Sequence, residues 1–200
     1  MAEMDDPCLV AVLAGGASLR MGSSKALAPL GGRPLIAWPL AAAAAAGLRA
    51  VVVAKADTAL PPVGVPVWLE PAEPRHPLVG LVSALERAGG PVVAVACDQP
   101  WVPAALLGRL ARASSGRAAV ALRVAGRLEP FPARYGFEAL PRLRAALDAQ
   151  APLRRALGAL APARLDAAEL AALGDDPARL VAGVNTPEAL ADAEARLAAG

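Results

Sequence analysis

Short apolar runs alternate with longer stretches rich in Ala, Leu and Arg along most of this chain, and this alternation constrains the fold more than any other feature. It is typical of βαβ units around a mainly parallel sheet, so we predict an α/β fold. Several of the longer stretches begin with proline, which is favoured in the first turn of a helix. The expected strands are Leu9–Leu13, Ala50–Val53, Val65–Leu69, Val92–Ala96, Ala118–Val124 and Leu180–Val184, and the expected helices are Pro34–Ala46, Pro77–Arg87, Pro103–Arg112, Phe137–Ala149 and Pro187–Ala198.

Residues 123–135, RVAGRLEPFPARY, predict one antiparallel hairpin within this pattern. Gly126 separates two short mixed runs, and a turn there makes the second run an antiparallel addition to the sheet. Because Pro130 and Pro132 cannot donate to a ladder, we place that run at an edge. Residues 150–179 predict only short helices, and no repeat or change of composition divides the chain. We therefore expect a single domain over residues 1–200.

The composition raises the question of a membrane protein, since 56% of the residues are hydrophobic and the mean hydropathy is +0.45. The longest uncharged stretch, Pro34–Leu48, is shorter than the ~20 residues that span a bilayer, and it contains Pro39. Residues 1–7 carry acidic side chains where a secretory signal carries positive charge. These features predict no membrane span and a cytoplasmic protein.

The remaining bulk properties favour chemistry on small molecules. A net charge of +2 and an aromatic content of 3% give neither the basic surface nor the stacking platform of a nucleic-acid-binding protein. Cys8 and Cys97 both lie in apolar runs, where we expect reduced, buried thiols. The one histidine, His76, lies in a proline-rich loop, so a Ser/His/Asp site for nucleophilic hydrolysis is disfavoured.

The segment LAGGASLRMGSSK, residues 13–25, has the properties of a phosphate-binding loop. Gly15 and Gly16 let the chain turn after the first strand with backbone N–H groups free to meet a phosphate, although a bare glycine pair is also an ordinary turn. Arg20 and Lys25 add two cations suited to a triphosphate. The spacing matches neither the Walker loop nor the Rossmann G-x-G-x-x-G pattern.

Two polar residues further along are candidates for the same site. Asp98 follows a core strand, at the edge where open α/β sheets bind ligands, and it either holds a divalent cation or caps a turn. Asn185 is the only asparagine, and its position before Pro187 also suits a helix cap.

The motifs together carry a resemblance to a known family. Residues 13–25 with LGGRPL at 30–35 resemble the loop of nucleotidyltransferases that activate small molecules with an NTP. PLVG at 77–80, CDQPWVP at 97–103 and NTPE at 185–188 resemble, in order and spacing, later motifs of molybdenum cofactor guanylyltransferases. The resemblance implies a Rossmann-like three-layer sandwich that transfers GMP from GTP, with Mg²⁺, to the phosphate of molybdopterin. It also implies transient contacts with molybdopterin-synthesis proteins and with recipient molybdoenzymes.

Site residues follow from the resemblance position by position. Lys25 is assigned to the phosphates and Asp98 to Mg²⁺, and the cations Arg20 and Lys25 neutralise the leaving pyrophosphate. The nucleotide-binding residues are Leu13, Ala14, Gly15, Gly16, Lys25, Asp98 and Asn185.

The chain departs from the family pattern in four places: Glu70 replaces an aspartate, Ala54 an asparagine, Gly183 an asparagine and His76 a glycine. A molybdopterin cytidylyltransferase or another small-molecule nucleotidyltransferase is the nearest alternative. Cytidylyl enzymes tend to have alanine at the position of Gly15, which favours GTP for this chain. A nucleotide-binding accessory protein without turnover is the alternative from another class.

Overall fold

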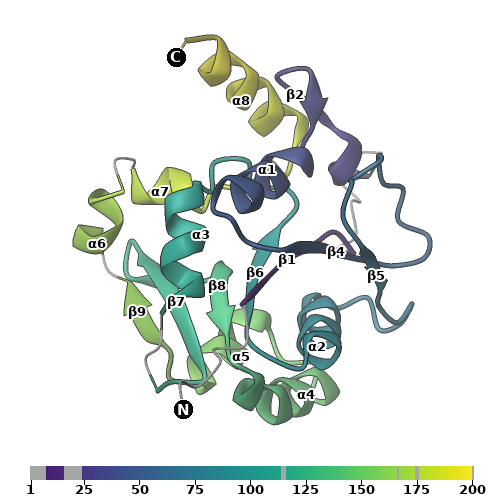
Figure 1. Cartoon of the computed structure of the whole chain (residues 1–200), viewed down its shortest axis with the longest axis vertical. Coiled ribbons are helices and arrows are strands. Elements are labelled where there is room, and N and C mark those ends of the chain that lie inside the picture. Colours follow the sequence, from purple (N-terminus) through teal and green to yellow (C-terminus); the bar gives the residue numbers. More distant parts are fainter. Residues whose placement is uncertain (1–7, 16–23, 114–115, 166, 174–175, 200) are drawn as a thin grey trace.

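The structure is a computed structural model that describes residues 8–15, 24–113, 116–165, 167–173 and 176–199. A seven-stranded sheet with the order β5-β4-β1-β6-β8-β7-β9 forms its centre (Figure 1). The strands are β1 (Leu9–Leu13), β4 (Ala50–Ala54), β5 (Val67–Leu69), β6 (Val92–Ala96), β7 (Ala119–Val124), β8 (Arg127–Tyr135) and β9 (Ala163–Leu165), and a separate ribbon pairs β2 (Pro29–Leu30) with β3 (Arg33–Pro34). The helices are η1 (Lys25–Leu27), α1 (Ala37–Ala45), α2 (Pro77–Ala88), α3 (Ala104–Ala111), η2 (Phe137–Ala139), α4 (Leu140–Asp148), α5 (Leu153–Ala159), α6 (Ala167–Ala171), α7 (Pro177–Leu180) and α8 (Pro187–Ala199).

The sheet has a parallel part in which β5, β4, β1 and β6 are neighbours. These strands are apolar on both faces: on β1, Ala11 packs into the core on one side, whereas Val10 and Val12 pack into the core on the other. Helices α2, α4 and α5 cover the first face, and α1 and α3 cover the second (Figure 1). Strands covered on both faces read as continuous apolar runs, which is why the sequence pattern predicted them. The predicted three-layer α/β sandwich is confirmed.

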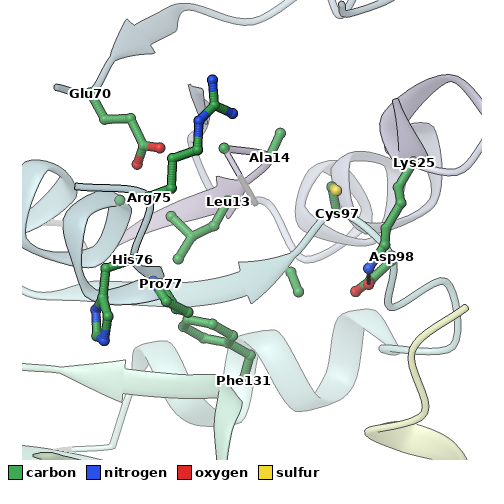
Figure 2. A pocket seen from close by; sticks show the side chains of 13 residues that line it. Leu13, Ala14, Lys25, Glu70, Arg75, His76, Pro77, Cys97, Asp98 and Phe131 are labelled. Atoms are coloured by element: carbon green, nitrogen blue, oxygen red, sulfur yellow. Dashed lines mark hydrogen bonds and ion pairs between the residues drawn. The ribbon is translucent and has the colours of Figure 1, made fainter. Parts of the chain in front are cut away.

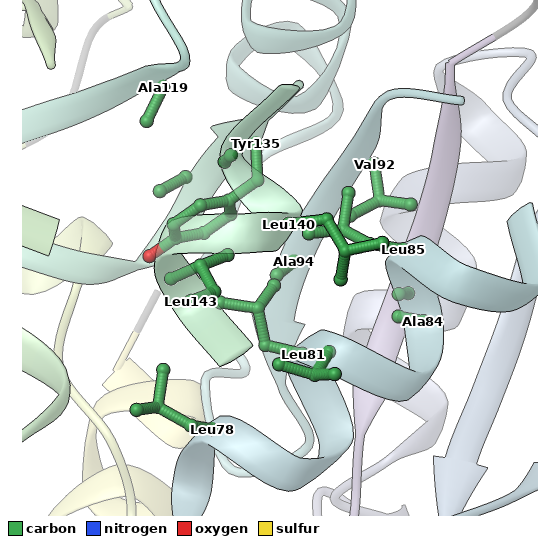
Figure 3. Packing of buried hydrophobic residues seen from close by; sticks show 14 of the residues in the cluster. Leu78, Leu81, Ala84, Leu85, Val92, Ala94, Ala119, Tyr135, Leu140 and Leu143 are labelled. Carbon is green, nitrogen blue, oxygen red and sulfur yellow. The ribbon is translucent and has the colours of Figure 1, made fainter. Parts of the chain in front are cut away.

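The first of these cores shows how the layers meet (Figure 3). Leu81 and Leu85 of α2 pack with Leu143 of α4 and with Tyr135 of β8, and all four side chains are fully buried. Tyr135 donates its hydroxyl to the carbonyl of Pro130, at 2.9 Å, so its polar end is satisfied inside the core. In the part of the chain that the structure describes, no helix combines the length and the apolar character needed to cross a membrane.

The antiparallel hairpin of β7 and β8 is present, but the predicted edge position of its second strand is wrong. Gly126 lies in the turn with φ 79°, and β8 pairs antiparallel with β7 on one side and with β6 on the other. The pairing with β7 shifts between Glu129 and Ala133. Pro130 and Pro132 lie in that irregularity, where the ladder needs no donor from them, so the prolines mark a bulge and β9 takes the edge.

The C-terminal part differs from the sequence prediction in two elements. β9 was not expected, since it is short and carries no clear alternation, yet it pairs in parallel with β7. The expected strand Leu180–Val184 is wrong: its first residue ends α7, a helix that Asp176 caps. The backbone N–H of Val184 then donates to the carbonyl of Asp98, at 2.8 Å. The segment therefore joins the loop after β6 instead of the sheet.

The carboxyl ends of β1, β4 and β6 lie at one edge of the sheet, because these strands are parallel. Helix α8 and the β2–β3 ribbon pack together near that edge around Leu30, Leu35 and Ala193 (Figure 1). The fold thus brings the loop after β1, the loop after β6 and the start of α8 to one place.

Candidate functional site

A pocket of about 290 Å³ lies at the carboxyl ends of β1 and β6 (Figure 2). Lys25 and Asp98 lie at one end of it and Glu70 lies at the other, with Leu13 and Ala14 between them. Ligands of open α/β sheets bind at this edge. The pocket therefore places a basic and an acidic group at one end and a separate carboxylate at the other.

Three predicted residues meet at the first end of the pocket. Lys25 Nζ lies 3.2 Å from Asp98 Oδ2 and donates a short hydrogen bond to Asn185 Oδ1. The side chains of Lys25 and Asp98 keep 20% and 13% of their surface exposed, so this pair is open to a ligand. Three residues that lie far apart in the sequence thus form one polar cluster. We call Lys25 and Asp98 the open pair, and Asn185 is its neighbour.

The oxygens of this cluster suit a hard divalent cation. Asp98 and Asn185 direct a carboxylate and an amide oxygen at the same cationic nitrogen, and Mg²⁺ is usually held by one or two carboxylates with waters and substrate phosphates. A Cβ at Gly183 would lie 2.7 Å from Asn185 Nδ2 and 3.3 Å from Asp98 Oδ1, so glycine keeps this space clear. Over the described ranges, no group of three or more His, Cys, Asp or Glu side chains gathers to hold a metal ion.

A second lysine–carboxylate pair, which the sequence did not suggest, lies at the other end. Lys55 Nζ is 3.2 Å from Glu70 Oε1 and donates to the carbonyl of Pro71 at 2.6 Å. The side chains of Lys55 and Glu70 expose only 2% and 4% of their surface, and we call them the sealed pair. Burial raises the pKa of the Glu70 carboxyl, and the Lys55 ammonium opposes that rise. The signal for Lys55 was its rarity, since it shares the sequence with only one other lysine.

Two glycines make room for the Glu70 carboxylate. A Cβ at Gly15 would lie 1.9 Å from Glu70 Oε1, and a Cβ at Gly80 would lie 2.6 Å from Glu70 Oε2. Real Cβ atoms do not approach an oxygen so closely, so the carboxylate occupies the space that side chains at these positions would need. Gly15, predicted as a nucleotide-binding residue, therefore lies against a carboxylate that lines the pocket.

Helix α2 begins at the wall of the pocket. His76 caps it, with Nδ1 accepting from the backbone N–H of Leu78 at 3.2 Å. His76, which we placed in a proline-rich loop, lines the pocket together with Pro77 and Gly80 of the predicted helix. Arg75 also reaches the pocket, and its guanidinium pairs with Asp57 at 2.7 Å.

Gln99 fixes the loop that carries Asp98. Its side chain is buried, with Oε1 accepting from the backbone N–H of Ala96 at 3.1 Å. Nε2 donates to the carbonyls of Phe131 and Val181, at 2.8 and 3.0 Å. One buried amide thus ties the end of β6 to the bulge of β8 and to the segment that leads to Asn185.

The cysteines are free thiols, as predicted. Cys97 lines the pocket beside Asp98, and burial raises its pKa to about 12. Burial likewise raises the pKa of Cys8 to about 11. Neither thiol is therefore ionised enough near neutral pH to act as a nucleophile.

The structure places most, but not all, of the predicted site residues. Leu13, Ala14, Gly15, Lys25 and Asp98 line one pocket, and Asn185 reaches it through Lys25. Gly16 and Arg20 lie outside the described residues.

Comparisons with known proteins identify the family of this chain. The MobA-like NTP transferase domain matches residues 10–166. The molybdenum cofactor guanylyltransferase of Rhodobacter capsulatus is 39% identical over 116 residues, which are 54% of this chain and 59% of that protein. The probable molybdenum cofactor guanylyltransferase of Deinococcus radiodurans is 36% identical over 146 residues, 72% of this chain and 75% of that protein. The chain thus matches less than two thirds of the length of the Rhodobacter relative.

Solved structures share the fold at lower identity. Molybdopterin-guanine dinucleotide biosynthesis protein A from Archaeoglobus fulgidus superposes with a TM-score of 0.82 and 24% identity, covering 96% of this chain and all (100%) of that one. The 2-C-methyl-D-erythritol 4-phosphate cytidylyltransferase from Thermus thermophilus gives a TM-score of 0.67 and 19% identity, covering 94% and 97%. With its sheet, its pocket and a match over most of its length, the chain belongs to the MobA-like NTP transferase family.

Proposed function

We propose that this protein transfers GMP from GTP to the phosphate of molybdopterin, releasing pyrophosphate and forming the guanine dinucleotide form of the cofactor. The names of its relatives support this activity. The observation that carries the proposal is a pocket with two unlike ends. Lys25, Asp98 and Asn185 form an end suited to phosphate and Mg²⁺, and Glu70 forms a carboxylate end. A nucleoside triphosphate has the matching polarity, with an anionic end and a base that donates hydrogen bonds.

Asp98 and Asn185 are the proposed Mg²⁺ ligands, because they supply hard oxygens at one point. When bound, Mg²⁺ would neutralise charge on the triphosphate and on the leaving pyrophosphate. Lys25 would contact the phosphates, and the Arg20 side chain is assigned to the same task. The backbone N–H of Gly15 is a proposed contact along the nucleotide, whereas the N–H of Ala14 donates to the carbonyl of Val53 at 2.8 Å.

The transfer asks the protein chiefly for positioning. A phosphate monoester with a second pKa near ~6 is already a nucleophile at neutral pH, so no general base is required. Lys25 would hold the triphosphate at the edge of the pocket and Asp98 would hold Mg²⁺ beside it, and the buried Gln99 keeps the Asp98 loop in place. The cytoplasm is the proposed location, which the two free thiols support.

Glu70 supports GTP over CTP. Guanine presents the N1–H and the 2-amino group side by side, and a carboxylate can accept from both. Cytosine and adenine instead present an acceptor beside their amino group, so the same carboxylate would face a lone pair. The carboxylate end of the pocket therefore favours guanine on chemical grounds.

Pyrophosphate release tests the proposal. The protein is incubated with Mg²⁺ and each of GTP, CTP, ATP and UTP, with and without molybdopterin. We expect release only with GTP and molybdopterin together. Release with CTP instead would identify a cytidylyltransferase, and binding of GTP without release under any condition would identify a nucleotide-binding accessory protein.

A further inference from the structure

The sealed pair of Lys55 and Glu70 is more than a structural ion pair, because its two carboxylate oxygens are unequal. Oε1 has Lys55 as a partner at 3.2 Å. Among the residues that the structure describes, Oε2 has no hydrogen-bond donor, and it points to the space between Gly80 and the pocket. Only one half of this nearly buried carboxylate is therefore satisfied by the protein.

Oε2 is not fully enclosed by the described residues and faces the pocket, where water can reach it while the pocket is empty. A ligand that excludes this water would have to supply a donor, because a buried acceptor without one costs about 1–3 kcal/mol, and more if it is charged. A pair that served stability alone would be fully hydrogen-bonded or replaced by apolar residues. Here, instead, glycine at positions 15 and 80 keeps the carboxylate against the pocket. The missing donor is then expected from the ligand.

Lys55 sets both the ionisation state and the orientation of the Glu70 carboxyl group that faces the ligand. Its ammonium is anchored by the carbonyl of Pro71 at 2.6 Å, so it cannot follow the carboxylate if that group rotates. It neutralises Glu70 at Oε1, while Oε2 has no donor among the described residues. Without Lys55, burial alone would favour the protonated carboxyl, which donates from one oxygen and no longer accepts from two donors.

We propose that Lys55 is a positioning residue for nucleotide selection: its buried ammonium holds Glu70 as a carboxylate whose free oxygen accepts from the N1–H and 2-amino edge of guanine. This inference rests on the proposed function, since it takes GTP as the nucleotide. It adds a residue that does not itself line the pocket.

Binding of Mg²⁺-GTP and Mg²⁺-ITP by calorimetry tests the role of Lys55, because ITP lacks only the 2-amino group. The variants are Lys55→Met, Glu70→Gln and the double variant. We expect Lys55→Met to weaken GTP binding about 10- to 100-fold and ITP binding by a clearly smaller factor, since ITP has the N1–H contact to lose but no 2-amino contact. An equal loss for GTP and ITP would overturn the proposal.

The double variant keeps the test decisive if Lys55→Met alone does not fold, because it removes both charges and preserves the shapes of the side chains. If Lys55 acts through Glu70, the double variant binds GTP as Glu70→Gln does, within about 2-fold, and both prefer GTP over ITP much less than the parent does. A further loss on adding Lys55→Met to Glu70→Gln would mean that Lys55 acts on its own and would overturn the proposal.

The parent protein separates this inference from the proposed function. If the parent binds GTP no better than CTP, the proposed GTP-dependent activity and the role of Lys55 both fail. If the parent selects GTP and Lys55→Met selects it equally well, only the role of Lys55 fails.

Discussion

The two ends of the pocket carry the same pair of side-chain types at the same separation, yet their surroundings differ. Lys25 lies 3.2 Å from Asp98, and Lys55 lies 3.2 Å from Glu70. The first pair keeps 20% and 13% of its side chains exposed, whereas the second keeps 2% and 4%. A lysine–carboxylate pair that water and ligands reach can exchange partners, while a buried one is fixed by the cost of separating its charges.

The difference follows from the elements that carry each pair. Lys25 begins the short helix η1 and Asp98 lies in the loop after β6, so both stand at the rim of the sheet. Lys55 and Glu70 each follow directly after a strand, β4 and β5, and the two strands are neighbours. The open pair is therefore suited to bind phosphate and metal, and the sealed pair to hold one carboxylate in place.

The largest effect is expected from removing the anion of the open pair. Asp98→Asn keeps the size of the side chain but removes the charge that a hard cation requires, so turnover should fall about 10²-fold or more, and the Mg²⁺ concentration for half-maximal activity should rise. Steady-state assays over a Mg²⁺ titration measure both quantities.

Asp148→Asn is the matched control, because Asp148 is exposed on α4, away from the pocket. It should leave turnover and Mg²⁺ demand unchanged. An Asp98→Asn protein with the Mg²⁺ demand of the parent would show that the carboxylate of the open pair does not bind the metal.

An intermediate effect is expected from Gly15→Ala, which disturbs the sealed pair and spares the open one. The new methyl group would overlap with Glu70 Oε1 and displace the carboxylate, so kcat/KM should fall about 10-fold for GTP and by less for CTP. The Mg²⁺ demand should not change. Competition assays with GTP and CTP measure the ratio.

Gly158→Ala is the control for this change, since a Cβ at Gly158 in α5 meets nothing within 4 Å. It should retain activity and stabilise the protein by about 0.5–1 kcal/mol through helix propensity. Equal proportional losses for GTP and CTP in Gly15→Ala would mean that Gly15 shapes the phosphate loop and has no part in base choice.

The smallest effect is expected in the pH dependence of stability. Because the pKa of Glu70 is raised in the folded protein, its contribution to the free energy of unfolding is fully present below its ordinary value of 4.5 and is lost as pH rises through the folded pKa. Glu70→Gln lacks this titration. The stability of Glu70→Gln relative to the parent should therefore increase with pH above about 4.5, as measured by urea unfolding.

The titratable and charged groups near Glu70 are its partner Lys55 and the pocket residues Lys25, Arg75, His76 and Asp98. All of them are present in both the parent and Glu70→Gln, so their titration is common to the two proteins. Glu86→Gln, which removes an exposed partner of Arg144, should show no such trend. A relative stability that is flat with pH would mean that Lys55 fully offsets the burial of Glu70.

Most of the sheet could be predicted because strands buried on both faces must be apolar throughout. β1 and β6 have the predicted bounds, and α2 and α8 begin at the predicted prolines. β9 was missed, and the expected strand at 180–184 was wrong, since three to five residues carry too little pattern to separate a strand from a turn. The prolines of β8 were misread because a bulge tolerates proline as well as an edge does.

Part of the candidate site could likewise be predicted from the sequence, and part could not. The loop at residues 13–25 and Asp98 could be identified from residue type and position after a strand. The Lys55–Glu70 contact could not, because nothing in the sequence states that β4 and β5 are neighbours with both residues directed inward.

The sequence by itself determined the three-layer α/β architecture and the position of a phosphate-binding loop, because apolar periodicity and glycine placement are local properties of the chain. Only the tertiary structure decided that Asn185 meets Lys25 and that Glu70 fills the space beside Gly15 and Gly80. It also decided that one lysine–carboxylate pair is open and the other sealed. Burial and distance between residues far apart in the chain are set by packing, and the electrostatics of a site depend on both.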